Sequence, residues 1–194
     1  MNRRLFSLVG AFLLWAGNAM PAWAAETYGI DPAHSGVHFK ISHIGLSWIH
    51  GRFNNYTGTF AIDPDDAGKC SFEMKINTES IDTNNNMRDN HLRSPDFFNV
   101  KQFPAISFES TGVKAVKDGY EVTGDLTMHG VTKPVTFALA GGKKAEFPKG
   151  VQRTGYSTEL ILKRSDFGVG KAQFGNALGE DVHIEISFEG VQKK

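Results

Sequence analysis

The chain of 194 residues carries 21 basic and 21 acidic side chains and one cysteine. This length suggests one domain with room for a sizeable core, and the balanced charge argues against a general nucleic-acid binder, which would show a basic excess. One cysteine excludes an internal disulfide framework and any metal cage built from several thiolates. The 15 phenylalanines and 21 glycines favour a β-rich protein.

Residues 1–24 have the features of an export signal. Arg3 and Arg4 precede an apolar run from Leu5 to Gly17, and the segment 21–24 supplies small residues two positions apart. This order is typical of a secretory signal peptide, and the run is too short to span a membrane. We expect cleavage after Ala24 and a soluble exported product. The Arg-Arg pair partly resembles a twin-arginine signal, but the rest of that pattern is missing, so ordinary export is favoured.

Strands are predicted along most of the remaining chain. Apolar and polar residues alternate at 37–41, 70–76, 135–139 and 182–188, and less regularly at 57–62, 105–110, 120–126 and 155–163. Since successive strand side chains point to opposite faces, each segment has one apolar face. Turn signals separate these segments at 63–66, 117–119 and Gly141-Gly142. About eight short strands with frequent turns predict an antiparallel sandwich or barrel.

One segment, 79–103, lacks this alternation. Ser94-Pro95 is typical of a helix start, with serine as the N-cap and proline at the first helical position. We therefore expect a helical excursion that crosses one end of the sheet.

Motifs for metal binding are weak. The segment 82–86 begins like a calcium loop, but it then has Met87 where glycine is needed and Arg93 where a bidentate glutamate should stand, so turn and cap chemistry is favoured. His34 and His38 would share a face on a strand, but His43 and His50 fall elsewhere and no acidic partner has a recognisable spacing. Neither a metal nor another cofactor is expected.

Polar residues gather at 88–93. Arg88 with His91, and Asp89 with Arg93, are spaced three or four apart and would share helix faces. One interpretation is an ordinary solvated helix with an Asp–Arg pair. The other is a polar collar whose guanidinium groups bind an anionic or carbonyl head group. Asp82 joins Asp89 and His91 in the one cluster that an acid–base enzyme could use.

Several sequence blocks resemble the YceI-like family of periplasmic polyisoprenoid-binding proteins. They are Ser42–Trp48 with Gly51-Arg52-Phe53, then 82–84, 88–89, 91–94 and 96–98, Phe103-Pro104-Ala105, 123–135, 165–168 and 185–191. The resemblance covers about residues 28–192. It implies an all-β fold, an extended eight-stranded antiparallel lipocalin-like barrel at 25–194, located in the periplasm. It also implies non-catalytic binding of a polyisoprenoid chain, of the quinone or polyprenyl phosphate type, or of a similar amphiphile.

Composition leaves a packed and a hollow barrel open, because phenylalanines can fill a core or line a cavity. For a hollow barrel, strand alternation nominates cavity-lining residues, although a register error of one residue would exchange the two faces. The predicted lining consists of Phe39, Ile41, Phe60, Phe72, Met74, Phe108, Met128, Phe137, Ile184 and Ile186. The predicted mouth, which would meet the head group, consists of His43, Trp48, Arg88, His91, Arg93, Phe97 and Phe98.

Two segments that depart from the family pattern, 84–87 and 141–150, are also predicted to lie at the mouth. Two alternative functions stay open: an accessory protein that presents quinone to a membrane cytochrome, and an isoprenoid-modifying enzyme. A transient contact with the inner membrane and a homodimer stay open as well.

Overall fold

The computed structural model describes residues 25–170 and 177–193, so the predicted signal peptide lies outside the described residues. Within these ranges the elements are, in chain order, β1 (Glu26–Ile30), η1 (Pro32–His34), β2 (Gly36–His43), β3 (Ser47–Phe53), β4 (Tyr56–Ile62), η2 (Ala67–Lys69), β5 (Ser71–Asn77), η3 (Thr78–Ser80), β6 (Ile81–Asp82), α1 (Asn86–Arg93), β7 (Ala105–Val116), β8 (Gly119–Met128), β9 (Val131–Glu146), β10 (Gln152–Lys163), η4 (Arg164–Phe167) and β11 (Leu178–Gln192), where η marks a 3-10 helix. No helix in the described part of the chain has the length and apolar character needed to cross a membrane.

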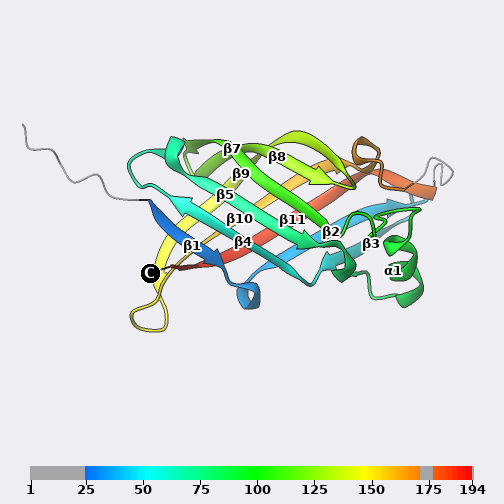
Figure 1. The fold of residues 1–194 in the computed structure, drawn as a ribbon, viewed down its shortest axis with the longest axis horizontal. Coiled ribbons are helices and arrows are strands. Elements are labelled where there is room, and N and C mark those ends of the chain that lie inside the picture. The colour runs from blue at the N-terminus through cyan, green and yellow to red at the C-terminus, as the bar shows by residue number, and fades with distance from the viewer. Residues whose placement is uncertain (1–24, 171–176, 194) are drawn as a thin grey trace, which may run out of the picture.

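Eight antiparallel strands close into an elongated barrel (Figure 1). Their order around the ring is β1-β4-β5-β7-β8-β9-β10-β11, and β1 pairs with β11 to close it. The long strand β11 pairs with β1 through residues 190–192 and with β2 through residues 178–187. The hairpin β2–β3, with β6 beside it, thereby extends the wall beyond the ring. The predicted eight-stranded antiparallel barrel is confirmed.

The eight strands of the ring are not the same eight that the sequence predicted. The sequence predicted β2, which lies in the wall extension, and missed β1, which completes the ring. It also missed β3 and β6. The pair Gly141-Gly142 is not a turn but lies within β9, where both residues have positive φ beside a register shift between β9 and β10. The prediction of a turn there was wrong because paired glycines also suit such an irregularity.

Aromatic side chains fill one end of the barrel. The Phe60 ring stacks on Tyr28 with centroids 5.1 Å apart and on Phe72 at 5.8 Å, and Tyr156 and Phe188 meet it edge-on at 5.8 and 5.4 Å. We call these five residues the aromatic plug. A Cβ at Gly190 would overlap the Phe60 ring, so glycine is required where the plug meets β11. Aromatic pairs of this kind contribute about 0.5–1.5 kcal/mol each beyond the area they bury.

The opposite end carries α1 and the β2–β3 hairpin (Figure 1). Asn85 caps α1 by accepting a hydrogen bond from the Arg88 amide at 3.0 Å. Ser94 stands at the other end of the helix as its C-cap, so the predicted helix start at Ser94-Pro95 was wrong. Residues 95–104 that follow form turns that lead to β7. The predicted excursion is therefore a helix of one segment, 86–93, that begins at an Asx cap instead of a serine cap.

Candidate functional site

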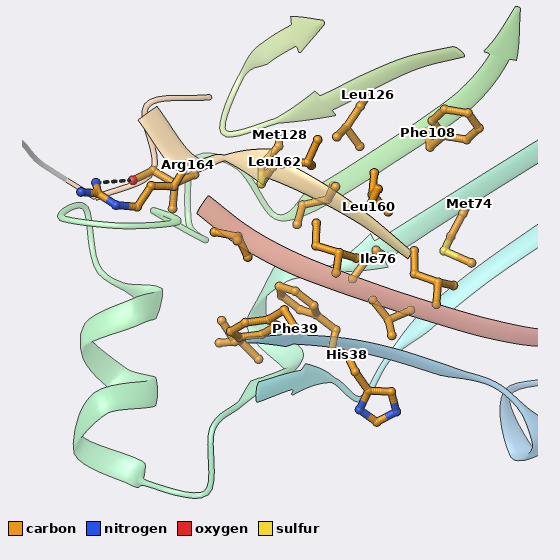
Figure 2. Close-up of a pocket in the computed structure, with 18 of the residues that line it drawn as sticks. His38, Phe39, Met74, Ile76, Phe108, Leu126, Met128, Leu160, Leu162 and Arg164 are labelled. Carbon is orange, nitrogen blue, oxygen red and sulfur yellow. Dashed lines mark hydrogen bonds between the residues drawn. The ribbon is translucent and has the colours of Figure 1, made fainter. Parts of the chain in front are cut away.

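A cavity of about 460 Å³ is lined at one end by Phe60, Phe72 and Phe188 of the aromatic plug and at the other by residues of α1. Its wall is mostly aliphatic and aromatic, and the volume lies within the range of about 300–1,000 Å³ that is usual for small-ligand sites. Figure 2 shows Met74, Phe108, Leu126, Met128, Leu160 and Leu162 pointing into this space from several strands of the ring. One half of the barrel is thus packed and the other half is hollow.

The ten residues predicted to line the cavity all lie in its wall: Phe39, Ile41, Phe60, Phe72, Met74, Phe108, Met128, Phe137, Ile184 and Ile186. They come from β2, β4, β5, β7, β8, β9 and β11. Phe60 and Phe72 also belong to the aromatic plug, so they form the closed end of the cavity rather than its side. The Phe39 ring lies over Gly51 on the paired strand, where a Cβ would overlap it, and this close approach gives the wall part of its shape.

Of the seven residues predicted at the mouth, five line the cavity: His43, Arg88, His91, Phe97 and Phe98. The other two, Trp48 and Arg93, lie outside the lining. Trp48 is on the outer face of β3, where its ring meets the ring of His183 at 5.0 Å and Lys40 lies over it at 5.3 Å. The predicted inward position of Trp48 was wrong because the inward side chains of β3 are Ile49 and Phe53.

The Arg93 side chain joins α1 to the preceding segment. Its Nε donates to the Glu79 carbonyl at 2.8 Å and its Nη2 to the Ile81 carbonyl at 2.7 Å. The predicted pair between Asp89 and Arg93 is not formed in this arrangement, because Asp89 is buried and its Oδ1 accepts from both the amide and the hydroxyl of Thr83. Asp89 and Arg93 do lie four residues apart in one helix, as predicted. However, Asp89 contacts Thr83 and Arg93 contacts backbone carbonyls instead of each other.

Arg88 lines the cavity and is fixed by the same threonine. Its Nε donates to Thr83 Oγ1 at 2.7 Å and its Nη2 to the Thr83 carbonyl at 2.6 Å. Among the described residues, Nη1 of Arg88 has no hydrogen-bond partner. A guanidinium held in this way is positioned to donate a hydrogen bond to an oxygen atom at the mouth.

The side chains proposed for acid–base chemistry have separate partners. Asp82 accepts from the Asn84 amide at 2.9 Å and from Asn54 and Arg52 at 3.1 Å, and these bonds lower its pKa. Asp89 is held by Thr83. His91 Nε2 lies 3.2 Å from Asp96 Oδ2. The structure thus shows each of the three groups occupied in local contacts.

Histidines do not form the predicted pair. His34 lies in η1 and contacts Asp31 at 2.9 Å, whereas His38 is on β2, so the two do not share a strand face. Within residues 25–170 and 177–193, no group of three or more histidine, cysteine or acidic side chains is arranged to hold a metal ion.

Six polar residues of the cavity lining were not predicted from the sequence: His38, Thr59, Glu73, Thr83, Thr158 and Arg164. Arg164, which Figure 2 labels, directly follows β10. Its Nε donates to the Gly179 carbonyl at 3.0 Å and its Nη1 to the Gly170 carbonyl at 3.1 Å. Thr158 is buried, and its Oγ1 has no hydrogen-bond partner within the described residues. Thr158 and Arg164 each lie two residues from Leu160 or Leu162, so all four side chains point to the same face. Extending the alternation of β10 by two residues in each direction would have predicted both.

Glu180 keeps a negative charge beside Arg164. Its Oε1 accepts from the Ser165 amide at 3.0 Å and its Oε2 lies 3.6 Å from Arg164 Nη2. Hydrogen bonding from Ser165, followed by the charges of Arg164 and Lys163, lowers the pKa of Glu180. The positive charge of Arg164 is therefore paired with Glu180, and backbone carbonyls hold its guanidinium in place at the cavity wall.

The other segment predicted at the mouth, 141–150, lies at the opposite end. The loop between β9 and β10 extends beyond the plug, near the C-terminal end of β11 (Figure 1). This prediction was wrong because β9 continues through Glu146, which carries the loop away from α1. The segment 84–87 does lie at the α1 end, where it contains the cap and first turn of α1.

Known proteins share both the sequence and the fold of this chain. A UPF0312 protein of Pseudomonas aeruginosa is 41% identical over 187 residues, which cover 95% of each chain. Protein YceI of Escherichia coli is 41% identical over 197 residues and is covered completely, as is this chain. The crystal structure of the Campylobacter jejuni YCEI protein is 28% identical, with a TM-score of 0.69 over 79% of this chain and 90% of the other.

More distant structures share the fold. A domain of Saccharophagus degradans, described as a polyisoprenoid binding domain, has a TM-score of 0.65 at 16% identity and covers 86% of this chain and 98% of its own. The sequence profile of the YceI-like domain matches residues 28–190, which include most of the barrel wall and every residue that lines the cavity. The chain belongs to the YceI-like family.

Proposed function

We propose that this protein binds the hydrocarbon chain of a polyisoprenoid lipid, of the quinone or polyprenyl phosphate type, or of a similar amphiphile. The observation that carries the proposal is the cavity, whose wall is mostly apolar, whose inner end is closed by the aromatic plug and which has Arg88, His91 and Arg164 in its lining at the α1 end. The Saccharophagus domain with this fold, described as binding polyisoprenoids, supports the choice of ligand class.

Burial of the hydrocarbon supplies the binding energy. Each CH₂ group transferred from water is worth about 0.8 kcal/mol, so a five-carbon unit offers about 4 kcal/mol at most. Ordering of the lipid and its reduced freedom offset much of this gain. The wall limits the protein's share of that cost, because Phe39, Phe108 and Phe137 are held by neighbouring rings or strands before a ligand arrives.

The polar end of the ligand would remain at the mouth. Arg88, His43 and His91 line the cavity there, and Arg88 has one nitrogen available to an oxygen of the ligand among the described groups. A phosphate or a quinone carbonyl supplies such an oxygen. A bare hydrocarbon does not, so this end of the cavity favours amphiphiles over hydrocarbons.

We place the protein in the periplasm as a non-catalytic carrier. The first 24 residues have the order of an export signal. The groups that an enzyme would need, Asp82, Asp89 and His91, each contact a separate partner, which supports binding without chemistry.

Two neighbouring residues of β10 test the cavity. Leu160 lines it, whereas Ile161 is exposed on the outer face. Leu160→Trp fills part of the cavity and should weaken binding of an added polyprenyl phosphate about tenfold or more, because burying an apolar group of side-chain size is worth roughly 1.5–3 kcal/mol. Ile161→Trp, as the matched control, should bind like the unmodified protein. Equal binding by both variants would show that the lipid lies elsewhere.

A further inference from the structure

Exposed apolar side chains gather at the tip of the β2–β3 hairpin. Leu46 is 82% exposed, Ile44 49% and Trp48 48%. The hairpin lies at the same end of the barrel as α1, where Met87 is 81% exposed (Figure 1). Large apolar side chains collected on a projecting tip are unusual on a protein surface and commonly mark an interaction site.

The fold itself does not require an apolar tip. The Leu46 amide donates to the His43 carbonyl at 3.0 Å, and the two residues between them, Ile44 and Gly45, have φ values of 45° and 70°. Asparagine, aspartate or glycine suits such a turn, whereas a β-branched isoleucine is strained there. Ile44 and Leu46 also lie outside the cavity lining. Their apolar character therefore serves neither the turn nor the cavity.

The hairpin also lacks negative charge. The 31 residues from Pro32 to Ile62 contain no aspartate or glutamate, but they include Lys40, Arg52 and four histidines. Arg52 is paired with Asp82 at 3.1 Å, while the Lys40 ammonium lies over the Trp48 ring. An apolar tip with an aromatic ring and a cation behind it matches the layers of a bilayer surface, in which acyl chains lie beneath anionic head groups.

We propose that the tip formed by Ile44, Leu46 and Trp48 docks the protein on a bilayer that contains anionic phospholipids. The tip lies at the α1 end of the barrel, where Arg88, His91 and Arg164 line the cavity, so docking would bring this end to the membrane from which a lipid is taken or to which it is delivered. That purpose rests on the proposed function, but the docking surface is argued and tested independently of it.

The turn is suited to insertion. The Ile44 amide donates to the Ala177 carbonyl at 3.0 Å and the Leu46 amide donates to the His43 carbonyl, so the amides of both apolar residues of the turn are paired within the protein. These two donors can enter the bilayer interface already paired, so neither adds the cost of an unpaired backbone group. Trp48, with an apolar ring body and one N–H group, is of the type enriched at the level of the head groups.

Vesicle flotation tests the proposal. The exported, processed protein is mixed with phosphatidylcholine vesicles that either contain or lack phosphatidylglycerol. We expect flotation with the anionic vesicles, weaker flotation without phosphatidylglycerol, and a loss of about tenfold or more for Leu46→Asp, which replaces an inserted side chain by a charge. The matched control is Phe147→Asp at the opposite end of the barrel, where the ring is 72% exposed, and it should float like the unmodified protein.

A fluorescence measurement gives a second readout. In a chain that begins after Ala24, Trp48 is the sole tryptophan. Its emission should shift to shorter wavelength on addition of anionic vesicles, and brominated lipids should quench it. Equal flotation of Leu46→Asp and the unmodified protein would overturn the proposal. So would self-association of the unmodified protein that Leu46→Asp abolishes while neither protein floats, since the tip would then bind a second copy.

The two proposals fail separately. Leu46 is outside the cavity lining, so Leu46→Asp should retain whatever lipid the unmodified protein carries. A protein that carries lipid but does not float contradicts the docking surface alone. A protein that floats through its tip but has an empty cavity and refuses added lipid contradicts the proposed function alone.

Discussion

Three arginines near the mouth are held by carbonyl or hydroxyl oxygens, and each has a different place. Arg93 joins α1 to η3 and β6 and lies outside the cavity. Arg164 lines the cavity but is anchored by Glu180 and by carbonyls after η4. Arg88 lines the cavity with two nitrogens fixed by Thr83 and a third that faces no described acceptor. Of the three, Arg88 is therefore best placed to meet a head group.

Replacing Arg88 should separate the head group from the tail. Arg88→Met should weaken binding of a polyprenyl phosphate by about tenfold or more, because a hydrogen bond to a charged group is worth roughly 1.5–3 kcal/mol. Binding of the matching polyprenol should change much less. Competition between the two lipids measures this ratio directly. Arg52→Met, on the outer face of β3, is the control and should leave both affinities unchanged. An equal loss for both lipids after Arg88→Met would remove the head-group role.

At the level of elements, the 3-10 helix η1 separates β1 from β2, which pair with successive parts of β11. Asp31 stabilises this break: Oδ1 accepts from the Ala33 amide at 3.1 Å, and Oδ2 contacts Arg153 at 2.7 Å and His34 at 2.9 Å. Arg153 belongs to β10 and also contacts Glu189 of β11 at 3.2 Å. The carboxylate thus joins the break between β1 and β2 to two strands of the ring.

This contact predicts a dependence of stability on pH. Hydrogen bonding from Arg153, and then from His34, lowers the pKa of Asp31 from an ordinary value near 4 to about 2. Because the folded-state pKa is below that of the unfolded chain, the stabilisation is fully present above about pH 4 and is lost as pH falls toward 2. Asp31→Asn keeps a capping oxygen but removes the charge, so its melting temperature should lie below that of the unmodified protein near neutral pH.

The difference in melting temperature should shrink as the pH is lowered from about 4 to about 2, because Asp31 of the unmodified protein is then protonated as well. Thermal unfolding followed by circular dichroism at several pH values measures it. Asp118→Asn, in the exposed turn between β7 and β8, is the matched control and should show little difference at any pH. A difference for Asp31→Asn that stays constant across this window would contradict the assignment.

Sequence patterns identified strands where one face is buried and the other is wet. Alternation along β10 is an example, since Leu160 and Leu162 face the cavity and Ile161 faces solvent. The same rule failed for β1, which is five residues long, and for β3, whose residues Gly51 and His50 interrupt the pattern. The start of α1 was also missed, because an asparagine cap within a run of asparagines carries less signal than the pair Ser94-Pro95.

For the whole molecule, the family resemblance implied the barrel, but composition could not separate a packed interior from a hollow one. The structure contains both kinds of interior. Inward-facing side chains stack on one another in the aromatic plug, whereas those farther along the barrel stay apart and line the cavity. The difference depends on which rings meet across the barrel, and alternation along single strands carries no such information. For the same reason, the placement of Trp48 and Arg93 could not be predicted from spacing.

Native mass spectrometry of the protein purified from the periplasm tests the central claim most directly. The spectrum should contain a complex of the protein with about one lipid, and organic extraction should release a molecule with a polyprenyl chain only after denaturation. Phosphate or quinone in the released lipid would also identify the group near Arg88. An empty protein that refuses added quinones and polyprenyl phosphates would contradict the claim that the cavity holds a polyisoprenoid.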